Sequence, residues 1–172
     1  MLKLFGILLV LSASWGYAGA LVAQLNRRKK HLFDCGEMLE LLMGEIRYGK
    51  TPLREAFLQT ASRLEGCFGE ILNEIAEKIA KNNYRSLELV WKECFESRQK
   101  ELGFTKEEME VVKNIGKNLG YLDIQTQMAH LTMYQKQMEG FLEQEEKTSK
   151  EKKKLYRSLS MVAGVMVILL LV

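Results

Sequence analysis

Histidine and cysteine are the residues of this chain with the most chemical potential, and both are scarce. His31 and His130 are the only histidines, and Cys35, Cys67 and Cys94 are the only cysteines, in 172 residues. Imidazole and thiolate groups hold metals or act as nucleophiles where several of them converge. No CxxC or HExxH pattern brings them together, so we interpret the histidines as solvated or interfacial side chains. The cysteines are odd in number and widely spaced, which indicates reduced core thiols of a cytosolic domain and neither a disulfide framework nor a metal site.

The charged residues do not indicate an active site either. Carboxylates are plentiful, but they recur on amphipathic helical patterns, where such groups form the solvated face. Acids and bases are interleaved, so the net charge is only +3, and no basic stripe carries stacking aromatic residues. The sequence therefore predicts no enzyme, no cofactor, no small-molecule substrate and no nucleic-acid partner.

The amino-terminal end is a predicted transmembrane helix, residues 1–26. Leu4 to Leu25 carries no charged side chain and, as a helix, extends about 33 Å, which matches a hydrocarbon core of about 30 Å. A cleaved signal peptide is the alternative, because Ala18-Gly19-Ala20 imitates a cleavage site. The apolar stretch continues past that point, and the basic cluster Arg27 to Lys30 follows at once and resists translocation. We therefore expect a retained anchor.

The carboxyl-terminal end is a second predicted span, residues 155–172. The uncharged stretch Leu159 to Val172 is only about 21 Å long as a helix. Counting back to Leu155 lengthens the span, with Arg157 extending its guanidinium to the interface. A buried core helix is the alternative, but the last residues are apolar on every face. Two spans make the membrane itself a predicted partner.

The basic residues predict the topology. Arg27 to Lys30 lies just after the first span, and the cluster from Lys150 to Arg157 leads into the second. Because such clusters stay on the cytoplasmic side, residues 27–154 are expected in the cytoplasm and both termini on the far side of the membrane.

Both predicted spans carry small residues one turn apart. This spacing lets helix backbones approach closely, so these residues are candidates for packing of the spans against each other or a partner helix. They are Ser12, Gly16 and Ala20 in the first span and Ser160 and Gly164 in the second.

The middle domain, residues 27–154, is predicted to be all helical. Apolar residues recur every three or four positions throughout, beginning with the stripe Leu32, Cys35, Leu39, Leu42 and Ile46. This stripe continues the phase of the first span, but whether the two form one rigid helix stays open. No segment alternates with period two, so no sheet is expected.

Turn and cap residues divide the rest of the middle domain into helices. Thr51 and Pro52 suit a cap and a first helical position, Ser86 opens a further helix that Gly103 ends, and Thr105 with Glu108 forms a capping box. A last amphipathic pattern starts near Asp123 and places Ile124 on its apolar stripe before it runs into the second span. The fold class is therefore all-α: a small antiparallel bundle of about six helices between two transmembrane helices.

The segment Glu143 to Lys154 is dense in charge. One interpretation is a solvated helix with i,i+4 pairs such as Glu146 to Lys150. The other is contact of its lysines with lipid headgroups, and the two are compatible.

Three stretches together resemble a known family. They are Glu45 to Phe57 (EIRYGKTPLREAF), Leu119 to Asp123 (LGYLD) and Lys154 to Leu159 (KLYRSL). With the length and the two spans, they resemble stage III sporulation protein AB of endospore-forming Firmicutes. The resemblance covers essentially the whole chain.

The resemblance implies a mother-cell membrane component of a channel complex that joins the mother cell to the engulfed forespore. It implies a soluble domain similar to the six-helix domain of type II secretion platform (F) proteins. The implied partners are a cytoplasmic sporulation ATPase and other membrane proteins of the channel complex. A membrane-tethered helical adaptor or regulator unrelated to sporulation is the alternative with the same architecture.

The predicted partner contact lies at the first joint of the middle domain. Arg47, Tyr48, Lys50 and Arg54 place three cations beside a tyrosine, where a purely structural motif would be apolar. The alternative interpretation is that this segment is merely a well-capped turn.

Overall fold

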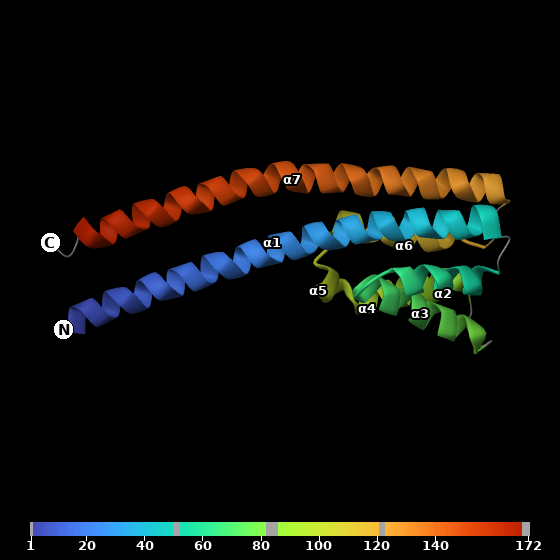
Figure 1. Cartoon of the computed structure of the whole chain (residues 1–172), viewed down its shortest axis with the longest axis horizontal. Helices are drawn as coiled ribbons and strands as arrows, with labels where there is room; N and C mark the ends of the chain where they lie inside the picture. The colour runs from blue at the N-terminus through green and yellow to red at the C-terminus, as the bar shows by residue number, and fades with distance from the viewer. Residues whose placement is uncertain (1, 50–51, 82–85, 121–122, 170–172) are drawn as a thin grey trace. The chain divides into compact units, whose positions relative to one another are not determined.

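The computed structural model describes residues 2–49, 52–81, 86–120 and 123–169 of the chain, with side chains for residues 19, 23–47, 52–81, 86–120 and 123–150. The described residues form seven α-helices and no strand, so the predicted all-α class is confirmed. The helices (Figure 1) are α1 (Leu2–Gly49), α2 (Leu53–Arg63), α3 (Cys67–Ala80), α4 (Leu87–Ser97), α5 (Gln99–Leu102), α6 (Lys106–Lys117) and α7 (Ile124–Leu169).

The chain divides into two compact units. One combines Met1–Lys29 with Glu143–Val172 and is called the terminal unit here; the other, Lys30–Leu142, is called the bundle. In the part of the chain with described side chains, no helix is both long and apolar enough to span a membrane. The predicted spans fall almost entirely on residues whose side chains lie outside that part, so the boundaries at residues 26 and 155 remain predictions.

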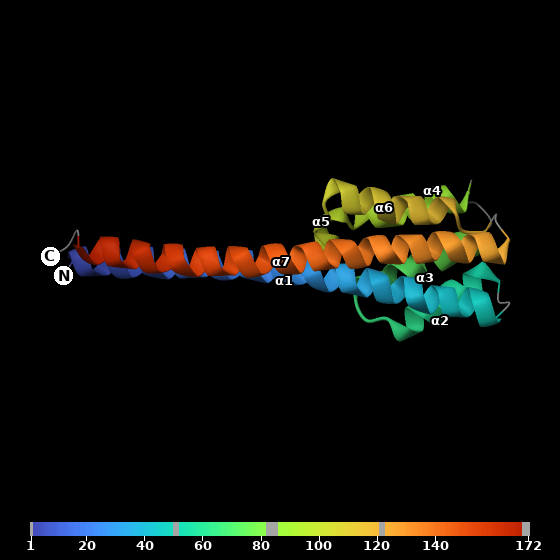
Figure 2. The ribbon, with the colours of Figure 1, turned by 90° about the horizontal axis from the view of Figure 1, so that it is seen from above.

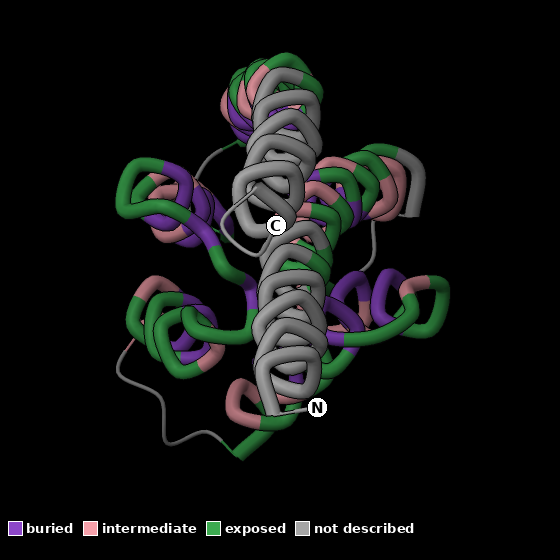
Figure 3. Tube along the Cα trace, turned by 90° about the vertical axis from the view of Figure 1, so that its left-hand side faces the viewer, coloured by how far each residue is buried: buried purple, intermediate pink, exposed green. Residues whose placement is uncertain are grey.

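The apolar stripe of α1 is buried in the bundle as predicted. Leu32, Cys35, Leu39, Leu42 and Ile46 all lie in the core. Seen end-on, the buried positions of the helices turn inward and the exposed ones outward (Figure 3). Helical spacing of apolar residues was therefore sufficient to identify the inner face of this helix.

Aromatic side chains link the shorter helices of the bundle. Trp91 on α4 lies with its ring centroid 5.9 Å from that of Phe57 on α2 and 4.8 Å from that of Phe95 one turn further on. Phe95 in turn contacts Phe68 of α3 at 6.1 Å. Such offset aromatic contacts add to the burial of large apolar surfaces, so this cluster is the centre of the core.

Two glycines let helices of the bundle approach closely. A Cβ atom added at Gly116 of α6 would lie 2.6 Å from Cγ of Trp91, and one added at Gly69 of α3 would lie 2.7 Å from the carbonyl oxygen of Leu64. Real Cβ atoms do not tolerate either distance, so no side chain fits at these two positions.

Most predicted helix ends are confirmed by their hydrogen bonds. The Ser86 hydroxyl accepts from the amide of Leu89 at 3.2 Å, and Gly103 has φ +67°, the left-handed conformation of a helix stop. In the capping box, the Thr105 amide donates to the Glu108 carboxylate at 2.7 Å and the Glu108 amide donates to the Thr105 hydroxyl at 3.3 Å. Asp123 caps α7 by accepting from two amides of its first turn.

Three local predictions are wrong. Pro52 is the cap residue of α2 and not its first helical residue, with ψ 141° and no side-chain cap bond. The single helix expected from Ser86 to Gly103 is broken at Arg98 into α4 and α5, where the Ser97 hydroxyl donates to the Cys94 carbonyl. Ile124, predicted on the apolar stripe of α7, is 50% exposed, because it is the first residue of the helix and lies in a turn whose residues up to Thr126 are all exposed.

The terminal unit contains ion pairs between α1 and α7. The Arg28 guanidinium lies 2.7 Å from the Glu145 carboxylate, which is only 4% exposed and also accepts from the Ser149 hydroxyl at 3.4 Å. Lys29 lies 2.5 Å from Glu146, and this contact lowers the pKa of the Glu146 carboxyl. Glu146 is therefore paired most closely with the other helix, while Lys150 on its own helix adds an electrostatic attraction, as the predicted i,i+4 pair requires.

Candidate functional site

The histidines do not form a catalytic or metal site in the part of the chain that the structure describes. His31 is half-buried; its Nδ1 donates to the Leu102 carbonyl at 3.0 Å, and its ring lies edge-on to Phe68 at 6.3 Å. His31 therefore holds α5 against α1. The prediction was a solvated or interfacial side chain, and the structure adds this contact between helices. Across the described residues, no group of three or more His, Cys, Asp or Glu side chains could hold a metal ion.

The three cysteines are buried free thiols. Burial raises the pKa of Cys35 to about 12 and those of Cys67 and Cys94 to about 11. A thiol reacts as its thiolate, so raised pKa values make these cysteines poor nucleophiles. They are core residues, as predicted.

We expect all three thiols to resist modification in the folded protein. Because each thiol is buried and its pKa is raised, a thiol-specific colorimetric reagent at near-neutral pH should react slowly with native full-length protein and rapidly with all three groups after denaturation. The measurement is the reaction time course with and without denaturant. Rapid reaction of even one thiol in the native protein would contradict the buried assignment.

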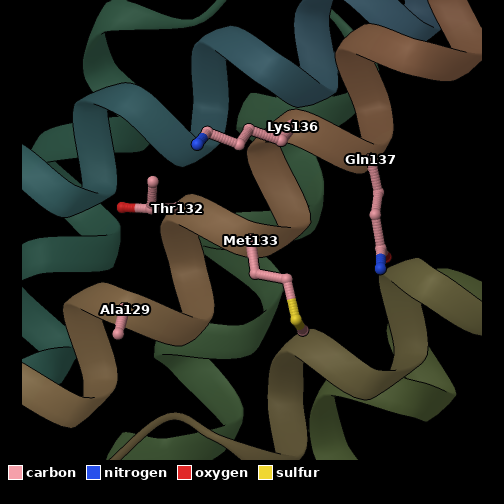
Figure 4. Close-up of a pocket in the computed structure, with 5 residues that line it drawn as sticks. All are labelled: Ala129, Thr132, Met133, Lys136 and Gln137. Carbon is pink, nitrogen blue, oxygen red and sulfur yellow. The ribbon is translucent and has the colours of Figure 1, made fainter.

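A shallow groove of about 430 Å³ lies along the outer side of α7 (Figure 4). The described residues that line it stand on successive turns of that helix: Ala129, Thr132, Met133, Lys136 and Gln137. They offer one ammonium, one amide and one hydroxyl group but no carboxylate, thiol or imidazole. The groove therefore lacks an acid–base pair and is not a candidate active site.

The predicted partner-contact residues flank the joint between α1 and α2. Arg47 is exposed in the last turn of α1, and Arg54 is the second residue of α2. The Arg54 side chain is 42% exposed, and its Nη1 donates to both carboxylate oxygens of Glu55 at 3.2 Å. Its Nε is buried and has no acceptor in the described part of the protein. Lys50 and the Tyr48 side chain lie outside the described residues.

The predicted packing residues of the spans all lie in helical backbone. Ser12, Gly16 and Ala20 belong to α1, and Ser160 and Gly164 belong to α7. Their side chains are outside the described set, so their role in helix packing stays a prediction.

Three joints of the bundle meet at one end. A Cβ added at Gly120, after α6, would lie 3.4 Å from Cδ2 of Leu53, which begins α2, and 3.6 Å from Cδ2 of Leu87, which begins α4. We call this end, where α2, α4 and α7 begin, the joint end (Figure 2). It contains the predicted contact residue Arg54 and also Lys81, Leu89, Lys117 and Ile124. The sequence did not predict that these residues share one end, because no local signal marks a surface built from distant segments.

The sequence and the fold both have relatives among known proteins. The pattern of the family described as "Stage III sporulation protein AB" matches residues 3–172. A similar protein of Bacillus subtilis (strain 168), described as "Stage III sporulation protein AB", is 28% identical over 173 residues, which are 99% of this chain and 99% of that protein. A solved structure described as "Stage III sporulation protein AB (SpoIIIAB)" superposes with a TM-score of 0.66 at 25% identity, covering 72% of this chain and 97% of its own.

Proposed function

Because this chain belongs to the stage III sporulation protein AB family, we propose that it is a non-catalytic membrane subunit of a channel complex between mother cell and forespore. The bundle serves as a platform for a cytoplasmic sporulation ATPase, and other membrane proteins of the complex are its neighbours. The observation that carries the proposal is the family match over residues 3–172, which includes both ends as well as the bundle. The same match favours this role over an adaptor unrelated to sporulation.

In this role the two ends anchor the protein in the mother-cell membrane around the forespore. Residues 4–25 and 155–169 are helical, as a membrane span requires, since a helix satisfies all its backbone polar groups internally. Basic clusters lie at the bundle side of both segments. They favour a cytoplasmic bundle with both termini across the membrane.

The ATPase contact includes Arg47, Tyr48, Lys50 and Arg54. Arg47 is exposed and the Arg54 side chain is 42% exposed, so each residue presents part of its side chain to a partner. Arginine beside tyrosine is typical of the residues that contribute most to protein interfaces.

The double variant Lys50→Glu, Arg54→Glu is expected to abolish ATPase recruitment while the bundle stays folded. Reversing two cations places like charges opposite an acidic partner surface, which should lower ATPase recovery at least about tenfold. The measurement is recovery of the ATPase with tagged full-length protein extracted in detergent from sporulating cells and quantified by mass spectrometry.

The matched control is Lys100→Glu, Lys106→Glu, which makes the same change in charge at two exposed lysines away from the joint end. It should recover the ATPase like the parent protein. Failure of the parent to recover the ATPase would overturn the proposed role, whereas full recovery by the folded Lys50→Glu, Arg54→Glu variant would overturn only the proposed contact.

A further inference from the structure

We propose that the cytoplasmic face of the membrane crosses α1 near Gly19 and α7 near Leu155, so that residues 20–26 of α1 stand outside the hydrocarbon core. The lysines from Lys150 to Lys154 then form the cluster that contacts anionic lipid headgroups. The inference rests on the proposed function and adds the depth of the anchor and its lipid contact. The observation that carries it is the register of the two helices within the terminal unit.

Two ion pairs define how α1 lies against α7 in the terminal unit. The Arg28 guanidinium lies 2.7 Å from the Glu145 carboxylate, and the Lys29 ammonium lies 2.5 Å from that of Glu146. The two helices run antiparallel and side by side there (Figures 1 and 2). Each step toward the N-terminus of α1 is therefore level with one step toward the C-terminus of α7. The two pairs differ in register by about two residues, or about 3 Å, and their mean places Leu25 level with Ser149.

This register makes the two predicted span boundaries uneven. Asn26, the last residue of the first predicted span, is level with about Thr148, whereas Leu155, the first residue of the second, is level with about Gly19. The offset is about seven residues, or about 10 Å along the helices. A tilt of about 20° shifts the levels of two neighbouring helices by only about 3 Å. The two boundaries therefore do not lie at one membrane face.

The charged residues of α7 decide which boundary moves. Residues 150–157 carry five cations and one acid. A hydrocarbon core that reached Asn26 would also surround residues 150–154, which are level with residues 20–24 of α1. A core that ends at Gly19 leaves only Leu21, Val22 and Leu25 outside as large apolar residues. Charges inside a bilayer cost more than a few apolar side chains left in water, so the boundary of α1 is the one that moves.

The basic residues that follow the first predicted span supply a second observation. Three of the four, Arg28, Lys29 and Lys30, form ion pairs with acids of the chain itself. The acid that Arg28 meets, Glu145, is only 4% exposed, so this pair is turned toward protein. Lys150, by contrast, is exposed and begins the basic run that leads into the second span. The lysines of α7, rather than the cluster of α1, are therefore the cations left to meet the membrane.

Anionic phospholipid headgroups fit this position and this charge. Several lysines immediately on the cytoplasmic side of a span attract anionic lipids. An acidic protein segment would attract the same lysines, and the experiments separate it from lipid. The level of the cluster, directly beside the start of the second span, favours the headgroups.

Cysteine accessibility measures the depth of α1. Full-length Ala23→Cys, Ser12→Cys and Lys147→Cys are reconstituted in vesicles of phosphatidylethanolamine and phosphatidylglycerol and treated with a membrane-impermeant maleimide. The three native thiols are buried, so the parent protein should give a low background. Ala23→Cys is exposed and level with Glu151. It should react like Lys147→Cys and at least about tenfold faster than Ser12→Cys, because hydrocarbon disfavours the reactive thiolate.

The outcomes separate the depth of the anchor from its existence. Protection of Ala23→Cys to the same degree as Ser12→Cys overturns the boundary at Gly19. Equally rapid reaction of Ser12→Cys and Lys147→Cys would instead contradict the membrane anchor, and with it the proposed function.

Disulfide formation tests the register directly. The pair Leu25→Cys, Ser149→Cys should form an intrachain disulfide on mild oxidation of the reconstituted protein, detected by mass spectrometry of the unreduced digest. The pair Leu25→Cys, Tyr156→Cys lies two turns further along the same face of α7 and should not. It is the pair that would meet if the boundaries at residues 26 and 155 were level. A disulfide in the second pair and none in the first would overturn the inference.

Two triple variants, each removing three cations, test the lipid contact. They are Lys152→Gln, Lys153→Gln, Lys154→Gln and Arg27→Gln, Lys29→Gln, Lys30→Gln. The first should reduce the phosphatidylglycerol that stays bound to detergent-extracted protein at least about tenfold, because each lysine near the surface adds to the attraction. The second should retain it, and lipid mass spectrometry gives both amounts. Parental lipid on the first variant, with or without loss of an acidic protein partner, would overturn the headgroup contact.

Discussion

Replacing Trp91 by alanine is expected to lower the free energy of unfolding of the bundle by about 3–5 kcal/mol, the usual cost of truncating a buried aromatic residue. Trp91 is fully buried, contacts the rings of Phe57 and Phe95, and its Nε1 donates to the Val112 carbonyl at 2.8 Å. The indole therefore connects α2, α4 and α6. Its removal leaves a cavity at the point where three helices meet.

The measurement is urea unfolding of full-length protein in detergent, followed by far-ultraviolet circular dichroism. The conservative variant Trp91→Phe keeps an aromatic ring but loses the indole donor, so it should cost clearly less than the alanine variant. A loss below about 1 kcal/mol for Trp91→Ala would mean that the core repacks around the missing ring, which a close-packed interior does not allow.

Replacing Gly116 by alanine is expected to destabilise the bundle by about 1–3 kcal/mol, although alanine is the better helix former. The added methyl group would lie 2.6 Å from Cγ and 2.7 Å from Cβ of Trp91. The indole cannot move aside easily, because it is buried and hydrogen-bonded to the same helix that carries Gly116. Steric overlap therefore outweighs the gain in helix propensity.

Gly140→Ala is the matched control for this substitution. Gly140 lies within α7, and a Cβ there would meet no atom within 4 Å. It should raise stability by up to about 1 kcal/mol, through helix propensity alone. In a Trp91→Ala background the cost of Gly116→Ala should become smaller, because Cγ and Cδ1 of the indole have been removed and only Cβ of residue 91 remains 2.7 Å from the added methyl group. Equal effects of Gly116→Ala in both backgrounds would contradict the steric explanation.

Local sequence signals predicted the ends of several helices. Ser86, Gly103, Thr105 and Asp123 act through hydrogen bonds or backbone angles within a few residues of themselves, so their roles follow from residue type and spacing. The break between α4 and α5 at Arg98 did not follow, because no glycine or proline marks it. Its position is consistent with the need to bury Leu102, whose carbonyl accepts from His31 of α1.

The candidate site was predicted only in part. The motif around Arg47 and Arg54 drew attention to the first joint, and the resemblance to the stage III sporulation protein AB family is confirmed by the match over residues 3–172. Lys81, Lys117 and Ile124 were not predicted as surface residues of a common end. These residues share one end of the bundle only because three joints pack together, and no local sequence pattern indicates that packing.

By itself, the sequence determined the helical class, the inner face of α1, the family and most of the caps, because periodicity and capping act over distances of a few residues. Only the tertiary structure decided which side chains meet across the bundle: Gly116 against Trp91, His31 on Leu102 and Gly120 beside Leu53 and Leu87. It also decided that Glu146 makes its close ion pair with Lys29 of the other helix. These contacts join residues far apart in the chain, and they follow from packing, which a single sequence does not display.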